Sequence, residues 1–178
     1  MREFDFIDLT FFLENYGEEK TLTFLKTFRC ERDHDREDYL HNKAIIMEKK
    51  AISRTYLAVD GNGAILGHFS IGMKCMRIPD DTPISKNTRK RMNIDEDTGV
   101  AQSYLLGQLG RDDSSPKGFG KELLSESLRR LIDANRIVGC RMVRLDCTDD
   151  LVPYYENNGF IRIDKNEREN LNQMVILL

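Results

Sequence analysis

Residues 101–121 read A-Q-S-Y-L-L-G-Q-L-G-R-D-D-S-S-P-K-G-F-G-K. Residues 101–110 predict a buried strand with interior glycines, and a glycine inside a strand often marks a bulge or the close approach of a ligand. The loop Arg111 to Lys121 follows, and residues 122–136 then predict a helix with one apolar stripe. That stripe consists of Phe119, Leu123, Leu124, Leu128, Leu131 and Ile132. The chain therefore runs from a strand through a glycine loop into a helix.

This order of elements predicts a phosphate-binding loop. A helix N-terminus exposes unpaired N–H groups and the positive end of a dipole, and glycines let a phosphate approach the backbone. Lys117 and Lys121 flank the turn, where they either add charge or simply face solvent. The P-loop pattern G-x-x-x-x-G-K-[ST] is absent, and Gly118-Phe119-Gly120 lacks the third glycine of the dinucleotide pattern. The ligand therefore belongs to another class of phosphate compound.

Helical and strand-like patterns alternate in the rest of the chain. Residues 35–52 predict an amphipathic helix, and residues 54–59 and 64–73 predict two antiparallel strands joined by the turn 60–63. Residues 141–147 predict a second central strand. A short helix then begins around Asp150 to Pro153 and ends at Gly159, because proline fits only the first turn and glycine favours the C-cap. Residues 159–164 and 170–178 predict two closing strands.

Residues 74–99 form an unusually long connection. A basic run, Lys86 to Arg91, precedes an acidic run, Asp95 to Asp97, and a short helix over 85–92 would be capped by Ser85. Long connections in compact domains are often functional. Two interpretations stay open: a charged excursion that faces solvent, or a rim that meets the substrate.

Length and composition limit the class of protein. The chain has 178 residues, 40% hydrophobic and 32% charged, which fits one compact domain and excludes a collagen-like or disordered chain. The net charge of −3 provides no global field for nucleic acid, although a local patch stays open. No apolar run suits a membrane span and no secretory signal is evident, so we expect a cytoplasmic protein that does not bind membranes. The scattered cysteines (Cys30, Cys75, Cys140 and Cys147) indicate no metal site, and Cys140 and Cys147 are predicted to be packing residues.

The stretch from about Tyr56 to Phe160 resembles the GCN5-related N-acetyltransferase superfamily, which transfers an acetyl group from acetyl-CoA to an amine. Ser115 to Gly120 matches both glycines of the family pattern Q/R-x-x-G-x-G/A. Tyr154 to Phe160 matches the later pattern F-Y-x-x-x-G-F, with a helix and a strand between the two matches. The chain departs from the family at Ser115 in place of Gln or Arg, at Pro116, which has no N–H, and at Thr148, where many relatives have Asn.

The resemblance implies a fold and a domain organisation. We expect an α/β (α+β) fold with a mixed, mostly antiparallel central sheet, flanked by helices and splayed between its two central strands. Residues 1–178 would form a single acetyltransferase domain, with 1–53 as an N-terminal helical segment and 54–178 as the cofactor-binding core.

The resemblance also implies the site residues. Backbone amides of Leu109, Gly110 and Arg111 would receive the pantetheine arm and the acetyl oxygen of acetyl-CoA. The pyrophosphate would rest on the loop residues Lys117, Gly118, Phe119, Gly120 and Lys121. Tyr155 resembles the general acid that protonates the CoA thiolate, the alternative being a tyrosine that only packs.

No general base is assigned. Relatives often have a carboxylate on the strand before the loop, and this strand offers only Gln102, Ser103, Tyr104 and Gln108. His68 has a suitable ordinary pKa, but a lone strand histidine is more often structural.

The predicted function is N-acetylation of a primary amine by direct attack on acetyl-CoA, with no metal. The acceptor is a small molecule, a protein or an aminoacyl-tRNA, and a homodimer stays open. One alternative is a toxin-type acetyltransferase that acts on aminoacyl-tRNA, because Phe28-Arg29-Cys30, Tyr39-Leu40 and Ala44 resemble the N-terminal region of such proteins. Another alternative is a CoA-binding module without turnover, which the altered Ser115-Pro116 pair suggests.

Overall fold

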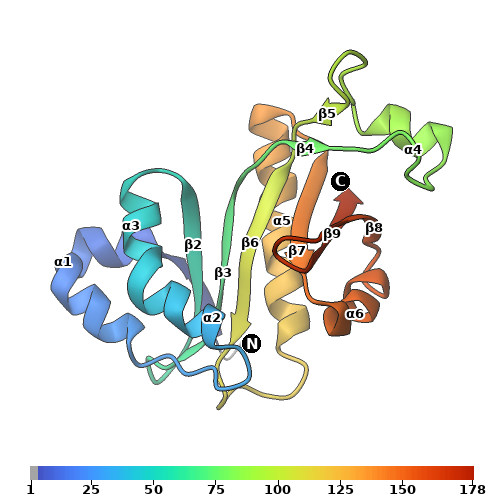
Figure 1. The fold of residues 1–178 in the computed structure, drawn as a ribbon. Coiled ribbons are helices and arrows are strands. Elements are labelled where there is room, and N and C mark those ends of the chain that lie inside the picture. Colours follow the sequence, from blue (N-terminus) through green and yellow to red (C-terminus); the bar gives the residue numbers. More distant parts are fainter. Residues whose placement is uncertain (1–3) are drawn as a thin grey trace. The chain divides into compact units, whose positions relative to one another are not determined.

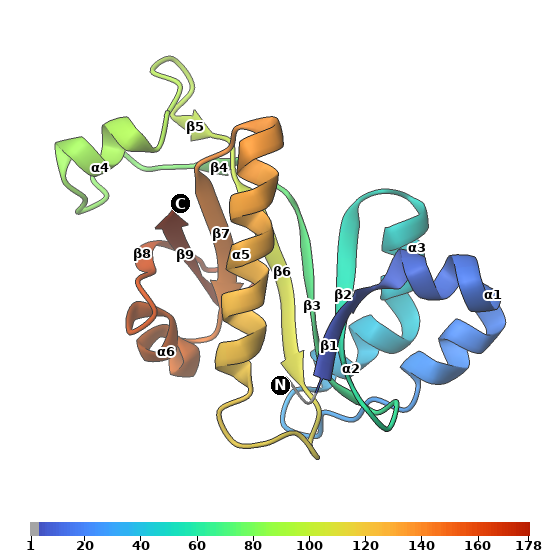
Figure 2. The same ribbon diagram turned by 180° about the vertical axis from the view of Figure 1, so that it is seen from behind.

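The computed structural model describes residues 4–178, which divide into two compact units (Figures 1 and 2). The first unit consists of Met1–Gly72 and Gly107–Arg129, and the second of Met73–Leu106 and Arg130–Leu178. Strand β6 (Tyr104–Arg111) and helix α5 (Gly120–Val138) each begin in one unit and end in the other. Each unit therefore consists of two separate stretches of the sequence.

Three antiparallel strands begin the sheet of the first unit: β1 (Phe4–Asp8), β2 (Ser53–Asp60) and β3 (Ile65–Met73). The predicted β2–β3 hairpin is confirmed, since the Asp60 amide donates to the Ala64 carbonyl at 3.0 Å and Gly63 has φ +82°. Strand β1 was not anticipated from the sequence. Its neighbour β2 pairs with it from Phe4–Asp60 to Asp8–Tyr56.

Helices of the first unit follow β1. Helix α1 (Leu9–Leu25) is capped by the Asp8 carboxylate, which accepts the Phe11 amide at 2.7 Å, and it kinks at Gly17. The helix predicted over 35–52 is present in three consecutive pieces: α2 (His34–Asp38), the π-helical turn η1 (Tyr39–Lys43) and α3 (Ala44–Lys49). Buried side chains of the helices, of the segment between α1 and α2 and of the strands form one core cluster, which includes Leu9, Leu25, Phe28, Tyr39, Leu40, Ala44, Leu57 and Ile65.

The long connection forms a folded part of the second unit. It contains β4 (Met76–Arg77), α4 (Lys86–Arg91) and β5 (Val100–Ala101), and β4 pairs with β5. The predicted cap of α4 is confirmed, because the Ser85 hydroxyl accepts the Thr88 amide at 3.0 Å. Its apolar residues join the sheet residues in one buried cluster: Met76, Ile78, Met92, Ala101, Met142, Ile163 and Val175.

The strand predicted over 101–110 is divided between β5 and β6. The Lys74 amide donates to the Ser103 carbonyl at 3.0 Å, and the Ser103 hydroxyl donates to the Lys74 carbonyl. This pair of contacts with the connection takes Gln102 and Ser103 out of strand pairing, so β6 begins at Tyr104.

Strands β7 (Met142–Cys147), β8 (Ile161–Asn166) and β9 (Leu171–Leu177) complete the second unit. Strand β9 pairs antiparallel with both β7 and β8, whereas β6 pairs parallel with β7 at Tyr104–Val143 and Leu105–Arg144. The strand order is β1-β2-β3-β6-β7-β9-β8. The mixed, mostly antiparallel sheet is therefore confirmed, and the splay between central strands stays a prediction. No helix within residues 4–178 is long and apolar enough to cross a membrane.

Candidate functional site

The loop between β6 and α5 is shaped by its own hydrogen bonds. The Ser115 amide donates to the Asp112 carbonyl at 3.1 Å, and the Ser115 hydroxyl donates to the same oxygen at 2.6 Å. Ser115 is buried. The residue that stands where the family has Gln or Arg thus closes the turn that leaves β6.

Within the loop, some backbone amides are already engaged. The Phe119 amide donates to the Pro116 carbonyl at 3.1 Å, and the Lys121 amide donates to the Gly118 carbonyl at 3.0 Å. By contrast, the amides of Lys117, Gly118 and Gly120 donate to no acceptor among residues 4–178. Unpaired amides at the start of a helix form an anion-binding site. The five residues predicted to hold pyrophosphate thus offer unpaired donors at these three positions.

Two features fix the conformation of this loop. Gly118 has φ +90°, which side-chain-bearing residues rarely adopt, and no atom lies within 4 Å of the position that a Cβ would occupy. The ring of Phe119 is 5% exposed and meets the ring of Phe4 edge-on at 5.0 Å. Phe119 therefore anchors the loop to the core, while Gly118 leaves its outer side open.

Basic residues lie close to the open amides in the sequence. Arg111, at the end of β6, and Lys117 and Lys121, which are exposed, form no ion pair with any residue in the described part of the chain. Cations without acidic partners next to unpaired amides favour an anionic ligand. Charge and backbone donors at the start of α5 thus suit a ligand with phosphate groups.

Close packing explains why residue 110 of β6 is a glycine. A Cβ there would lie 2.9 Å from Arg36 Cβ and 3.0 Å from His68 Nε2, so the glycine lets α2 and β3 pack against the strand. Its neighbour Leu109 is half-buried. The close approach predicted from the sequence is real, but the approaching atoms belong to the protein itself.

The polar side chains near the predicted site either form hydrogen bonds within the protein or are uncharged. His68 is fully buried, and burial lowers its pKa to about 3, while its Nε2 lies 3.2 Å from the Arg36 carbonyl. Gln108 accepts a hydrogen bond from Arg36 Nη1 at 2.6 Å. Burial raises the pKa of Tyr104. The structural role predicted for His68 fits this environment.

Tyr155 lies in the second unit, on helix α6 (Val152–Glu156), which follows the short 3₁₀ turn η2 (Asp149–Leu151). Pro153 occupies the first turn, and Gly159, with φ +88°, ends the segment, as predicted. The Tyr155 ring is 7% exposed and packs edge-on against Tyr154 at 5.1 Å and Phe160 at 5.6 Å. The assignment of Tyr155 as general acid stays a prediction.

Cys140 and Cys147 are buried, as expected of packing residues, and Cys75 is exposed. Burial raises the pKa of the Cys147 thiol to about 11, with Asp146 contributing next. Cys147 is therefore protonated at neutral pH and is a poor nucleophile. Within the described chain, no group of three or more His, Cys, Asp or Glu side chains is arranged to hold a metal ion.

A cavity of about 370 Å³ lies in the second unit, beneath the long connection. Polar residues of the connection and of the segments before β6 and β7 line this cavity: Asn93, Asp95, Thr98, Gln102 and Arg141. The apolar residues of the connection pack with residues of the sheet. The charged residues of its basic and acidic runs are exposed, apart from the half-buried Arg89, as the solvated interpretation expects.

No family model matches this chain, and no curated protein matches its sequence. Solved structures do match its fold. A tyrosine-to-phenylalanine variant of KacT has a TM-score of 0.77 at 18% identity, covering 99% of this chain and 95% of KacT. AtaT complexed with acetyl-methionyl-tRNAfMet has a TM-score of 0.68 at 20% identity, covering 84% and 85% of the two chains.

A third match is AtaTR bound with acetyl-CoA, with a TM-score of 0.68 at 19% identity over 97% of this chain and 93% of the other. At these identities the similarity concerns the fold. The mixed α/β fold that the resemblance implied is therefore confirmed by its similarity to these structures.

Proposed function

From the fold that this chain shares with KacT and AtaT, we propose that it is an acetyl-CoA-dependent N-acetyltransferase of the GCN5-related superfamily. The observation that carries the proposal is the loop at the start of α5, where the amides of Lys117, Gly118 and Gly120 have no acceptor among residues 4–178. AtaTR, of the same fold, is known in a complex with acetyl-CoA. A pyrophosphate supplies the anionic oxygens that such a loop takes.

The reaction follows from these assignments. A neutral amine attacks the thioester carbon, the C–N bond forms and the C–S bond breaks. The amine loses a proton to solvent, and the Tyr155 hydroxyl would give a proton to the departing thiolate sulfur and regain one from solvent. Backbone amides of Leu109, Gly110 and Arg111 would stabilise the oxyanion of the intermediate, an effect of about 2.7 to 4 kcal/mol for one donor in other enzymes.

As the acceptor we propose the amino group of an aminoacyl-tRNA. AtaT, which shares the fold, is known in a complex with acetyl-methionyl-tRNAfMet. Helix α4 presents Lys86, Lys90 and Arg91 as exposed cations, none of which forms an ion pair within residues 4–178. Such cations suit RNA phosphates even in a chain whose net charge is −3.

Transfer of radiolabelled acetyl from acetyl-CoA tests the proposal. Purified protein is incubated with total aminoacyl-tRNA, with deacylated tRNA and with free amino acids. Label in aminoacyl-tRNA alone is the expected result, and label in free amino acids alone would replace the RNA acceptor by a small molecule.

Binding of acetyl-CoA without transfer to any amine would favour the non-catalytic CoA-binding module. A protein that does not bind acetyl-CoA at millimolar concentration would contradict the proposed function itself. The cytoplasmic location and the homodimer stay predictions from the sequence.

A further inference from the structure

Asp112 is the first residue after β6 and its side chain organises the start of the phosphate-binding loop. It is 7% exposed. Its Oδ1 accepts the Ser114 amide at 2.9 Å and the Ser114 hydroxyl at 2.5 Å. Its own amide donates to the Leu66 carbonyl of β3 at 2.9 Å, which fixes the residue on the sheet. One carboxylate oxygen thus sets the direction in which the loop leaves the strand.

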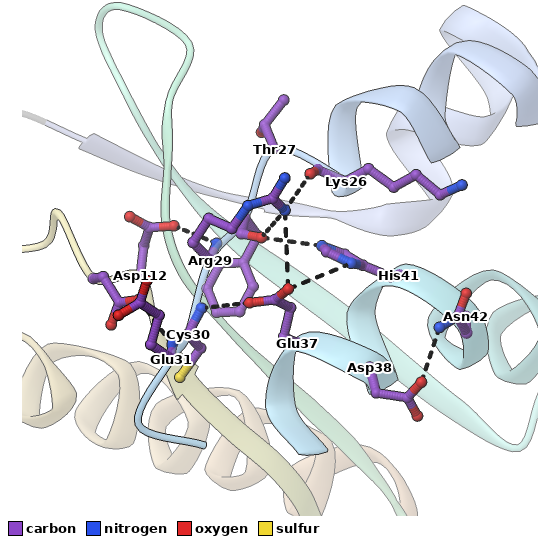
Figure 3. A network of polar contacts seen from close by, with 12 residues as sticks. Lys26, Thr27, Arg29, Cys30, Glu31, Glu37, Asp38, His41, Asn42 and Asp112 are labelled. Carbon is purple, nitrogen blue, oxygen red and sulfur yellow. Dashed lines mark hydrogen bonds and ion pairs between the residues drawn. The ribbon is translucent and has the colours of Figure 1, made fainter. Parts of the chain in front are cut away.

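The second oxygen of Asp112 joins this loop to the segment before α2. Oδ2 accepts the Arg29 amide at 2.8 Å (Figure 3). The Asp113 amide then donates to the Arg29 carbonyl at 2.9 Å, and the Asp113 carboxylate accepts the Glu31 amide at 2.8 Å. These alternating contacts hold residues 29–31 along residues 112–113.

The far side of this segment is held as well. Glu37 of α2 accepts the Cys30 amide at 2.8 Å (Figure 3). In addition, His41 Nε2 lies 3.0 Å from the Phe28 carbonyl. Phe28 is fully buried. Arg29, whose amide donates to Asp112, is therefore part of a segment that is held on both sides.

Electrostatics alone would place no carboxylate here. Asp112 and Asp113 come just before a loop whose unpaired amides and cations suit a pyrophosphate, and like charges repel. Arg32 neutralises Asp113 through a 2.7 Å contact, but no basic side chain in the described chain pairs with Asp112. Its carboxylate instead accepts hydrogen bonds from the Arg29 and Ser114 amides and from the Ser114 hydroxyl.

We propose that Asp112 is a positioning residue for cofactor binding: it holds the loop in the shape in which the Lys117, Gly118 and Gly120 amides face the pyrophosphate. This inference rests on the proposed function. An Asn at this position keeps one oxygen but places an NH₂ group against one of the donors that Asp112 accepts. The loop then loses either its turn at Ser114 or its contact with Arg29.

The test compares Asp112→Asn with the parent by calorimetric titration of CoA and of S-acetylpantetheine, which lacks the pyrophosphate. We expect the Kd for CoA to rise about tenfold, the size of one lost charge-assisted hydrogen bond. The Kd for S-acetylpantetheine should stay within about twofold, because that ligand does not reach the loop. Asp81→Asn, at an exposed carboxylate of the long connection, makes the same change in net charge and should leave both affinities unchanged.

The direction of the change in CoA affinity distinguishes a positioning role of Asp112 from a purely electrostatic effect of its charge. Removing a negative charge near a pyrophosphate tightens binding if only electrostatics matters, so tighter or unchanged CoA binding in Asp112→Asn overturns the inference. Equal weakening for both ligands also overturns it, since that is the result of a general loss of structure. If Asp112→Asn does not fold, Ser114→Ala and Asp112→Glu replace it, and parental CoA affinity in both of these variants would overturn the inference. A parent protein that binds no CoA would instead contradict the proposed function.

Discussion

Two adjacent tyrosines of α6 allow a matched test at the residue scale. Tyr155 is the predicted general acid, whereas the Tyr154 hydroxyl is buried and has no hydrogen-bond partner in the described chain. Tyr155→Phe should lower the single-turnover rate of acetyl transfer by on the order of 100-fold, because the thiolate then leaves without a proton donor. CoA affinity and Tm should stay close to the parent, since the ring is kept.

Tyr154→Phe is the control for that experiment. It removes a hydroxyl of the same kind from the neighbouring position, and loss of an unpaired buried polar group is neutral or stabilising. Its single-turnover rate should match the parent. Full activity in Tyr155→Phe would remove this residue from the mechanism and leave it as a packing tyrosine.

His68 gives a pH dependence of stability. Its pKa is lowered to about 3 by burial, from 6.5 in the unfolded chain. Below pH 6.5 the unfolded chain therefore binds a proton that the folded protein does not bind. Stability should be complete above pH 6.5 and fall by about 1.4 kcal/mol per pH unit as the pH decreases from 6.5 toward 3.

Urea unfolding at intervals from pH 7.5 to pH 4.5 measures this slope. That window lies above the pKa values of Asp95, Asp113 and Asp149, which are lowered from 3.8 by hydrogen bonds and thus contribute their slope at lower pH. His68→Gln keeps an N–H for the Arg36 carbonyl and cannot titrate. An equal slope in this variant and the parent would show that another group is responsible.

Single residues show where sequence reasoning reached its limit. The loop glycines and Tyr155 were identified because their patterns are local, and Gly118 indeed has the positive φ that its motif suggests. The structural roles of Gly110 and Asp112 could not be read from the sequence, because their partners are distant in it. Gly110 packs against Arg36 and His68, and Asp112 accepts the Arg29 amide. A local signal did exist: Asp112-Asp113-Ser114-Ser115 is typical of a turn in which Asp accepts the amide two residues on.

At the scale of elements, Gly118 tests the phosphate-binding loop. Gly118→Val forces a β-branched residue to φ +90°, so the loop must change shape and the Gly118 amide turns away from the ligand. The Kd for CoA should rise at least about tenfold by calorimetric titration.

Gly63→Val is the matched control for strain. Gly63, in the β2–β3 hairpin, has φ +82° and equally open surroundings, so the substitution costs similar stability, on the order of 1–3 kcal/mol. Its CoA affinity should remain parental. Equal losses of affinity in the two variants would indicate general destabilisation and not a phosphate-binding role.

The elements themselves were predictable where their signals are short-range. The Ser85 cap, the turn at residues 60–63 and the Pro153 and Gly159 boundaries all act over a few residues, and the structure contains each of them. Strand β1 and the break before β6 were missed. Both depend on pairing across long stretches of chain, β1 with β2 and Ser103 with Lys74, and propensity does not encode such partners.

At the scale of the whole molecule, cofactor binding should raise thermal stability. At 100 times its Kd a ligand contributes about 2.7 kcal/mol to the free energy of unfolding. For a chain of 178 residues this corresponds to an increase in Tm of roughly 5–10 °C, measured by differential scanning calorimetry with acetyl-CoA. At that same concentration of acetyl-CoA, the Tm of Gly118→Val should increase clearly less than that of the parent. A parent Tm that does not respond to acetyl-CoA would argue against binding to the folded state.

The division of each unit between two stretches of sequence has a consequence during synthesis. The ribosome completes residues 1–72 well before Gly107–Arg129, the stretch that finishes the first unit. At 5–20 residues per second the wait lasts roughly 3 to 11 s, during which β3 lacks its β6 neighbour and the Phe28 and His68 cluster lacks Gly110. Until Arg129 has emerged, the nascent chain therefore exposes the unpaired edge of β3. A polypeptide that ends near residue 100 would keep this edge unpaired and would aggregate instead of folding into a smaller protein.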